Sequence, residues 1–187
     1  MATQTKKDKS KKKWFTVIAP KEFSKIEIGE IYAYNIEDTL NKILKLNLMT
    51  LTKDPKKQNI RVSVKITETK GNQASTTFCS YELQPAYIKK LTKKAKSKID
   101  DSFIVTSKDG IKIRIKPLLF TRAKTNNSLL TAIRNNTRET LKNKFAEMSC
   151  SAIVESLLNF SLQKDLKIIN NKIYPIQNAV IKAFHTQ

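Results

Sequence analysis

An alternation of apolar and polar residues between positions 60 and 67 constrains the fold of this chain more than any other feature. Its apolar positions are Ile60, Val62, Val64 and Ile66. Successive side chains of a β-strand point to opposite faces, so this period buries one face and exposes the other. Lys70-Gly71-Asn72 then provides a turn, and residues 73–81 are rich in threonine and aromatic residues. The segment therefore predicts an antiparallel hairpin.

A second hairpin is predicted around Asp109-Gly110. Residues 99–106 and 111–115 flank this dipeptide, and its tolerance of positive φ makes it a strong hairpin signal. On the second strand, one face carries Ile111, Ile113 and Ile115, and the other carries Lys112, Arg114 and Lys116. We therefore expect the first face to be core and the second to be a row of cations.

The rest of the chain adds further strands and several helices. Strands are predicted at residues 14–18, 43–48 and 176–184, and helices at residues 85–96, 128–148, 151–159 and 162–170. The helical segments repeat their apolar residues at helical spacing, and either Ser149 or Ser151 is expected to cap the third of them. The pattern predicts an α+β fold with a central antiparallel β-barrel-like sheet and flanking helices, mostly C-terminal.

The first thirteen residues differ from the rest of the chain. Residues 1–13 contain six lysines and almost nothing apolar. They cannot bury a core and are predicted to be a disordered basic N-terminal arm. Hydrophobic residues make up 40% of the whole sequence, which is enough for a real core, so residues 14–187 are predicted to form a single globular domain.

The charge of the chain indicates the kind of partner it has. The 36 Lys and Arg residues outnumber the 16 Asp and Glu residues, which gives a formal net charge of +20. Such an excess destabilises a compact state by self-repulsion unless a polyanion screens it. Nucleic acid is therefore favoured over an acidic membrane surface. No apolar run approaches the roughly 18 residues that a membrane span requires, and no membrane association is expected.

Several sets of cations, separated in sequence, are candidates for neutralising RNA phosphates. They come from the arm, the lysine-rich segment 85–96, the cationic face of the second hairpin, and the loop and helix after residue 120. The candidate RNA-binding residues are Lys11, Lys12, Lys13, Trp14, Lys89, Lys90, Lys93, Lys94, Lys96, Lys112, Arg114, Lys116, Arg122, Lys124, Arg134 and Arg138.

Two of these candidates have an alternative interpretation. Trp14 could stack on a base, but a lone tryptophan at the start of a domain more often anchors that edge to the core. Residues 120–127 carry short polar donors suited to phosphate and 2′-hydroxyl contacts, or they form a plain connection before the next helix. The sequence shows neither the aromatic signature of an RRM nor a GXXG loop, so recognition of shape and backbone is expected.

Catalytic and metal chemistry find little support in the sequence. With one His and three Gly, the chain has no phosphate-cradling glycine motif and no spacing typical of a nucleophilic triad. Cys79 and Cys150 are far apart, with only His185 to join them, so they cannot assemble a zinc site. Asp100 and Asp101 are neighbours on a strand and would point to opposite faces. We predict no enzyme activity, no metal and no cofactor.

Motifs along nearly the whole chain resemble one protein family. The chain opens with KKWFTVIAPKEF at residues 12–23 and Ile28-Gly29, continues with Ile99-Asp100-Asp101, Thr106-Ser107-Lys108-Asp109-Gly110 and Arg114-Ile115-Lys116, and closes with Lys172-Ile173-Tyr174-Pro175-Ile176. In this order they resemble the eS1 family of small-subunit ribosomal proteins of archaea and eukaryotes, historically called S3Ae.

The resemblance implies a structural, non-catalytic role in translation. It implies binding to small-subunit rRNA on the platform near the mRNA exit, contacts with neighbouring ribosomal proteins, and a cytoplasmic location. mRNA near the exit is a further candidate partner, and no homo-oligomer is expected. The family usually has a denser basic stretch where this chain has Thr125, Asn126 and Asn127. The alternative is a non-ribosomal module that binds RNA or DNA through backbone contacts.

Overall fold

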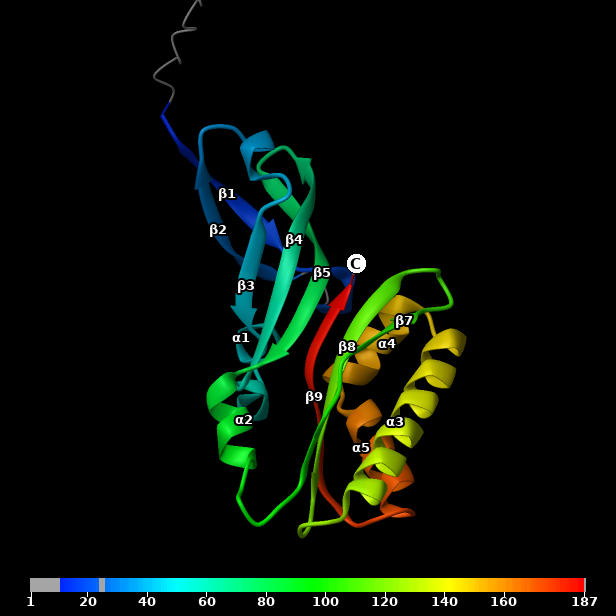
Figure 1. Ribbon diagram of the computed structural model, residues 1–187. Coiled ribbons are helices and arrows are strands. Elements are labelled where there is room, and N and C mark those ends of the chain that lie inside the picture. The colour runs from blue at the N-terminus through cyan, green and yellow to red at the C-terminus, as the bar shows by residue number, and fades with distance from the viewer. Residues whose placement is uncertain (1–10, 24–25, 187) are drawn as a thin grey trace, which may run out of the picture. The chain divides into compact units, whose positions relative to one another are not determined.

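The computed structural model describes residues 11–23 and 26–186, which divide into two compact units (Figure 1). The first unit takes its residues from the segments up to Leu44 and from Val64–Phe78, and the second from Lys45–Ser63 and from Cys79 onward. Residues 1–10 of the predicted arm lie outside the described residues. The single domain expected for residues 14–187 stays a prediction.

The first unit is a sheet built on a hairpin. It contains β1 (Lys13–Ile18), β2 (Glu27–Ala33), the start of β3 (Ile43–Asn47) and the parts of β4 (Ile60–Lys70) and β5 (Gln73–Leu83) next to their turn, with short 3-10 helices η1 (Lys21–Phe23) and η2 (Glu37–Thr39). β4 pairs with β3 and β5, and β1 pairs with both β2 and the start of β5. β4 and β5 meet at Gly71, whose φ of +59° suits glycine. The first predicted hairpin is confirmed.

The second unit is centred on the last two strands of the chain. Its strands are β6 (Lys98–Asp100), β7 (Phe103–Thr106), β8 (Lys112–Thr121) and β9 (Ile176–Thr186), together with the last residues of β5. β9 pairs antiparallel with β8 along one edge and with residues 80–82 of β5 along the other. β6 and β7 pair in succession with the free edge of β8. The second predicted hairpin is therefore confirmed, with Thr106 opposite Lys112.

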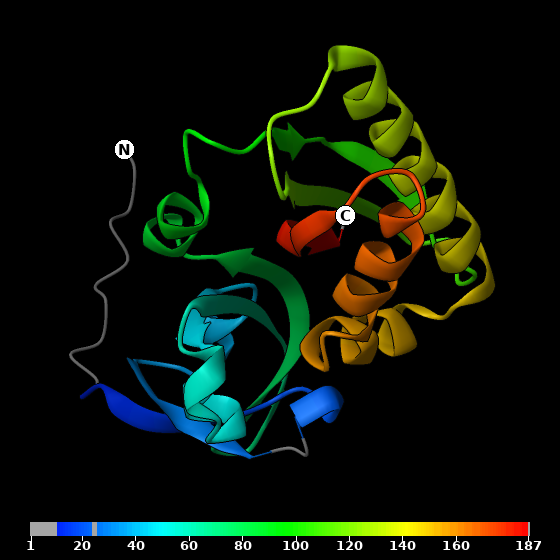
Figure 2. The same cartoon turned by 90° about the horizontal axis from the view of Figure 1, so that it is seen from below.

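The second unit also contains several helices. They are α1 (Leu48–Thr52), the 3-10 helix η3 (Pro55–Lys57), α2 (Pro85–Leu91), α3 (Asn127–Glu147), α4 (Cys150–Leu158) and α5 (Ser161–Asn171). Figures 1 and 2 show α3 and α5 on one side of β9 and α2 on the other. α3 buries the row Ile133, Thr137, Leu141 and Phe145. This spacing of four residues keeps the row on one helix face, which packs against the sheet and α5.

The mixed fold and the C-terminal position of most helices are confirmed, whereas the barrel-like sheet was wrong. By strand pairing, the described residues form one open sheet, because β2, β3 and β6 each have a partner on one side only. The sheet is also not wholly antiparallel, since β1 runs parallel to β5 from Thr16 to Ile18. The predicted strands supplied no signal for which edges would meet.

The lysine-rich helix is shorter than predicted. α2 ends at Leu91, and Thr92 follows in an extended conformation, with its Oγ1 donating to the carbonyl of Ile88 at 2.9 Å. A helix that continued to residue 96 would place Lys89 beside Lys93, and like charges four residues apart destabilise a helix. The lysines after Thr92 therefore lie in a turn rather than on a helix face.

Three further differences concern element boundaries. β8 runs on to Thr121 and α3 starts at Asn127, so the predicted loop 120–127 shrinks to residues 122–126. Ile111 lies in the turn and is 36% exposed, instead of joining Ile113 and Ile115 in the core. β2 and α1 were not predicted. β2 has a glycine and two glutamates among its seven residues, which obscure the alternation, and the five residues of α1 are too few to show a helical period.

Candidate nucleic-acid interface

The outward face of β8 carries a row of three cations. Lys112 and Arg114 are exposed and Lys116 is half-buried, while the intervening Ile113 and Ile115 are fully buried. The alternation of the strand thus fixes the backbone from one side and presents positive charge on the other. The structure places this predicted row as the sequence indicated.

The cations of α2 and β8 meet at a surface hollow within the second unit. Lys89 from α2, Lys116 from β8 and Lys182 from β9 line a hollow of about 400 Å³. Lys89 and Lys116 were predicted as members of two separate sets. Lys182 was missed, although a single lysine inside the apolar run Ala179–Phe184 is itself a signal of an exposed position. We call Lys89, Lys116 and Lys182 the lysine triad.

Glu82 also lines this hollow, and Asp100 forms an ion pair with Lys182. The imidazole Nε2 of His185 lies 3.6 Å from Oε1 of Glu82, and both residues line the hollow. Asp100 lies 3.4 Å from the Nζ of Lys182 and 3.0 Å from that of Lys98. Partial burial raises the pKa of Asp100, but the hydrogen bond and charge of Lys98 and the charge of Lys182 lower it more, so the pKa lies below its ordinary value. Lys182 is thus partly neutralised, whereas Lys89 and Lys116 have no ion pair among the described residues.

The segment after α2 and the loop after β8 are tied together. The N–H of Ser97 donates to Oγ1 of Thr121 at 3.0 Å, and the N–H of Thr125 donates to Oγ of Ser97 at 3.1 Å. These bonds bring Lys96 and Lys124, the residues just before Ser97 and Thr125, onto neighbouring backbone segments. Lys124 and Arg122 are exposed, and Lys96 is half-buried. A second pair of predicted sets therefore converges here.

The side chain of Thr121 joins the segment around Ser97 to the loop after β8, and its replacement by Val should lower the stability of the protein. The residue is fully buried, and its hydroxyl accepts from Ser97 and donates to the carbonyl of Ala123 at 2.6 Å. Thr121→Val keeps the shape but leaves these backbone groups unpaired, so we expect a loss of about 2–4 kcal/mol in the free energy of unfolding. Urea unfolding measures it. The exposed Thr106 serves as a control, since Thr106→Val should change stability by less than about 0.5 kcal/mol; equal effects for the two variants would contradict the role of Thr121.

The basic stripe of α3 is divided by an internal ion pair. The Arg138 guanidinium binds Asp101 through two bonds, from Nε to Oδ2 at 2.5 Å and from Nη2 to Oδ1 at 2.7 Å. It also lies 5.8 Å from the ring centre of Phe103. This fork-like geometry is the strong form of a charged pair. Arg138 therefore joins α3 to the sheet, while Arg134 and Lys142 on the same stripe stay half-buried and exposed respectively.

The Asp101 pair makes stability depend on pH in a defined direction. The hydrogen bond from Arg138 lowers the pKa of Asp101 most, burial opposes it, and the Ser102 N–H and the charges of Arg138 and Arg134 lower it further, to a net value below the ordinary 3.8. A carboxyl with a lowered folded pKa stabilises the fold above its unfolded pKa, and this contribution is lost as the pH falls through the folded pKa.

We therefore expect Asp101→Asn to lower the melting temperature at pH 7. The difference in melting temperature between this variant and the parent protein should become smaller as the pH falls. Differential scanning calorimetry between pH 7 and pH 2 measures both. The exposed Glu139 on α3 offers a matched control, because Glu139→Gln should leave the acid branch of the curve unchanged. A gap between Asp101→Asn and the parent that stays constant down to pH 2 would contradict this account.

An exposed aromatic group lies in the first unit. Trp14 on β1 is 61% exposed, so the favoured expectation that it anchors the core was wrong. It stands opposite Tyr32 of β2, with ring centres 4.8 Å apart. The Nζ of Lys12 lies 5.4 Å from the ring centre of Tyr32 and 5.1 Å from that of Tyr34. Neither tyrosine was predicted from the sequence, and Tyr34 lies just after the end of β2. We call Trp14, Tyr32 and Tyr34 the aromatic platform.

Sequence comparison now assigns the chain. The Ribosomal S3Ae family matches residues 2–186. The chain belongs to this family. It is 33% identical over 179 residues to the small ribosomal subunit protein eS1 of Saccharolobus islandicus (strain L.S.2.15 / Lassen #1), which covers 95% of this chain and 86% of that protein. Over 177 residues it is 34% identical to the eS1 protein of Saccharolobus solfataricus, with 94% of this chain and 85% of that protein covered. The eS1 protein of Nanoarchaeum equitans is 32% identical over 180 residues, or 96% of this chain and 91% of that protein.

Membership of the S3Ae family confirms the resemblance drawn from the ordered motifs. It also confirms the prediction of a non-enzymatic protein, because the family consists of structural ribosomal proteins. Within residues 11–23 and 26–186, no helix has the length and apolar character needed to cross a membrane. Over the same residues, no group of three or more His, Cys, Asp and Glu side chains is arranged to hold a metal ion.

Proposed function

We propose that this S3Ae family member is a structural component of the small ribosomal subunit and that it binds rRNA through its phosphates. The observation that carries the proposal is family membership over residues 2–186. The relatives it matches are named as small ribosomal subunit proteins. A net charge of +20 fits a partner as highly charged as rRNA.

The cationic side chains have two different roles in this proposal: some bind phosphates, and one stabilises the fold. The lysine triad, together with Arg122 and Lys124, neutralises phosphates. Lys89, Arg122 and Lys124 are exposed, and the half-buried Lys116 and Lys182 line the surface hollow. Arg138, also a candidate from sequence, holds α3 in place through Asp101 instead. Neighbouring ribosomal proteins cover part of the remaining surface.

The position that we propose within the subunit is the platform near the mRNA exit. The support for this finer placement is the ordered motif set, from the opening at residues 12–23 to the closing strand at residues 172–176. A protein of the small subunit at this position is cytoplasmic. At the platform it also lies close to the mRNA that leaves the subunit, so mRNA is a further partner in this proposal.

A gradient experiment tests the proposed function. Tagged protein expressed in its source cells should sediment with small subunits and remain there after a wash in moderate salt. High salt should release it, because phosphate contacts are weakened by counterions. Recovery of the protein only in the light fractions, free of rRNA, would refute the assignment.

The aromatic platform makes a specific prediction for binding. Stacking of a base on an aromatic side chain contributes about 1–3 kcal/mol, so Trp14→Ala should weaken binding to small-subunit rRNA by about 5-fold to 150-fold. Its melting temperature should stay close to that of the parent, since Trp14 is 61% exposed. Filter binding measures the affinity. Ile43→Ala removes a side chain that is 55% exposed in the same unit and should bind normally; equal losses in both variants would contradict stacking.

A further inference from the structure

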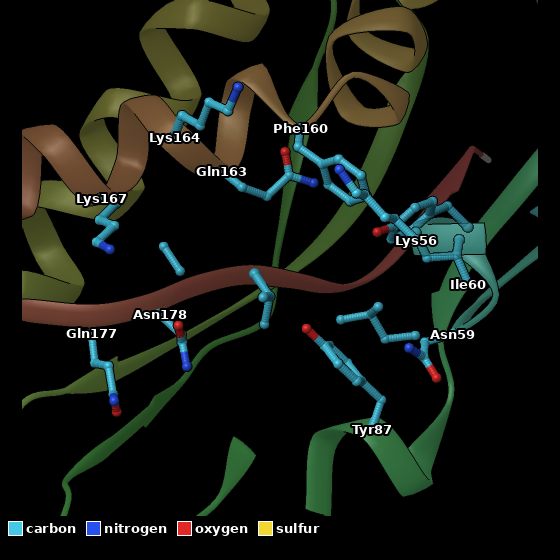
Figure 3. A pocket seen from close by; sticks show the side chains of 14 residues that line it. Lys56, Asn59, Ile60, Tyr87, Phe160, Gln163, Lys164, Lys167, Gln177 and Asn178 are labelled. Atoms are coloured by element: carbon cyan, nitrogen blue, oxygen red, sulfur yellow. The ribbon is translucent and has the colours of Figure 1, made fainter. Parts of the chain in front are cut away.

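A pocket opens in the second unit where β5 and β9 diverge. The two strands pair only from residue 80 to 82 of β5, opposite residues 183–185 of β9. Below this point residues 177–180 of β9 line a pocket of about 240 Å³ together with residues from η3, β4, β5, α2 and α5. Figure 3 shows Tyr87 rising from α2 on one side, and Phe160 and Gln163 coming from the start of α5 on the other.

The interior of the pocket combines flat apolar surfaces with one unused acceptor. Ile60, Leu83, Val180 and the aromatic residues Tyr87 and Phe160 contribute to its lining. Gln163 is only 6% exposed. Its Nε2 donates to the carbonyl of Leu157 at 3.3 Å, and its side chain also hydrogen-bonds the buried Tyr81 of the lining, whereas its Oε1 has no hydrogen-bond partner among the described residues. A buried acceptor without a partner is costly, and a native structure rarely keeps one that nothing uses.

The rim of the pocket is positively charged. Lys56, Lys164 and Lys167 line it and are exposed, and none of the described lining residues is acidic. In Figure 3 Lys56 points toward Phe160, whereas Lys164 points away from the centre of the pocket. The long lysine stems allow these ammonium groups to reach a phosphate at the rim without a change in the backbone.

These features together fit one kind of occupant. A nucleobase has two apolar faces, carries N–H donors on its edge, and is attached to a phosphate. A peptide strand added to the free edge of β9 would satisfy backbone groups but would leave three lysines and the Gln163 carbonyl unused. Proteins read unpaired RNA bases by placing them against aromatic side chains and bonding their edges.

We propose that this pocket receives the base of one unpaired rRNA nucleotide, which donates an edge N–H to Oε1 of Gln163 while its phosphates lie against Lys56, Lys164 and Lys167. The inference rests on the proposed function, because it names the contact that one nucleotide of the rRNA makes. It differs from the surface contacts of the lysine triad, which hold phosphates and carry no information about the base.

Photocrosslinking inside intact small subunits tests the pocket directly. Tyr87 is replaced by photoreactive benzoylphenylalanine in the tagged full chain, and small subunits are purified and irradiated. The expected product is an adduct with a single rRNA nucleotide. The same probe at Gln177, an exposed residue that lines the pocket, gives the same nucleotide and covers the case in which the Tyr87 variant fails to enter subunits.

A probe at Ile104 separates failure of the pocket from failure of the function. Ile104 is 46% exposed and stands opposite Arg114 on the cationic face. RNA adducts at Ile104 without RNA adducts at either pocket position would overturn the pocket while the proposed function stands. Adducts from the pocket to a protein would assign it to a protein neighbour and likewise overturn it. Absence of the tagged parent chain from small subunits would overturn both.

Gln163→Leu supplies a second readout that a purely structural role would not give. The substitution removes the unpaired acceptor together with the bonds to Leu157 and Tyr81, so the free protein should melt at a somewhat lower temperature than the parent but still fold. In assembled subunits the crosslinked nucleotide should become about tenfold more reactive toward reagents that modify the base edge. Gln73→Leu, at an exposed position in the other unit, should change neither. Unchanged reactivity in Gln163→Leu subunits would overturn the role of this side chain.

Discussion

Phe145→Ala should lower the free energy of unfolding by about 3–5 kcal/mol, the usual cost of deleting a large buried ring. Phe145 is fully buried on α3, and its ring centre lies 6.4 Å from that of Phe184 on β9, at an interplanar angle of 68°. The change opens a cavity and removes this edge-to-face contact between helix and sheet. Urea unfolding followed by circular dichroism measures the loss. Since whole domains are stable by only about 5–15 kcal/mol, a sizeable unfolded fraction is expected near 37 °C.

An exposed residue in the same unit provides the control for this result. Ile168 on α5 is 63% exposed, and Ile168→Ala should change the unfolding free energy by less than about 0.5 kcal/mol. A Phe145→Ala protein that lost less than about 1 kcal/mol would show that α3 does not hold the sheet as the packing indicates.

The joint replacement of Lys89, Lys116 and Lys182 by Ala should have the largest effect on binding. Each phosphate contact adds about one unit to the slope of log affinity against log salt, so the triple variant should lose about two to three units. If variant and parent bind equally in 1 M salt, this slope makes the variant about 100-fold to 1,000-fold weaker at 0.1 M. Filter binding to a small-subunit rRNA fragment, repeated over a salt series, measures the slope.

The matched control removes the same charge elsewhere. Lys42, Lys53 and Lys70 are exposed lysines outside all the predicted sets, and their joint replacement by Ala also lowers the net charge by three. Its salt slope should fall by less than about one unit, because diffuse charge without a phosphate contact contributes little. Equal slopes for the two triple variants would show that total charge, rather than the lysine triad, governs binding.

Local patterns in the sequence were sufficient to predict most elements of the fold. The alternation at residues 60–67 and the Asp109-Gly110 turn predicted both hairpins, because period and turn chemistry act within a few residues. The α3 row from Ile133 to Phe145 was equally clear. Closure of the sheet was not predictable, since it depends on which distant edges meet. The parallel pairing of β1 with β5, for example, joins Thr16 to Gln73.

The candidate site was predictable in its composition but not in its geometry. The charge count indicated phosphates, and the row on β8 followed from its period. That Lys89 and Lys182 line one hollow follows from the pairing of the strands. That Lys96 and Lys124 lie on neighbouring segments follows from the hydrogen bonds of Ser97. Arg138 was indistinguishable from a free cation until the structure placed Asp101 against it. Tyr32 and Tyr34 were overlooked because β2 itself was not predicted.

Ultraviolet crosslinking of intact small subunits, followed by mass spectrometry of the chain's RNA-bound peptides, tests the central claim most directly. The account predicts crosslinks in residues 89–96, 112–116 and 122–124, which carry exposed cations of the second unit, together with Trp14 of the aromatic platform and Tyr87 of the pocket. Crosslinks confined to other surfaces of the protein, or a chain that yields no RNA-bound peptide in subunits that contain it, would contradict the account.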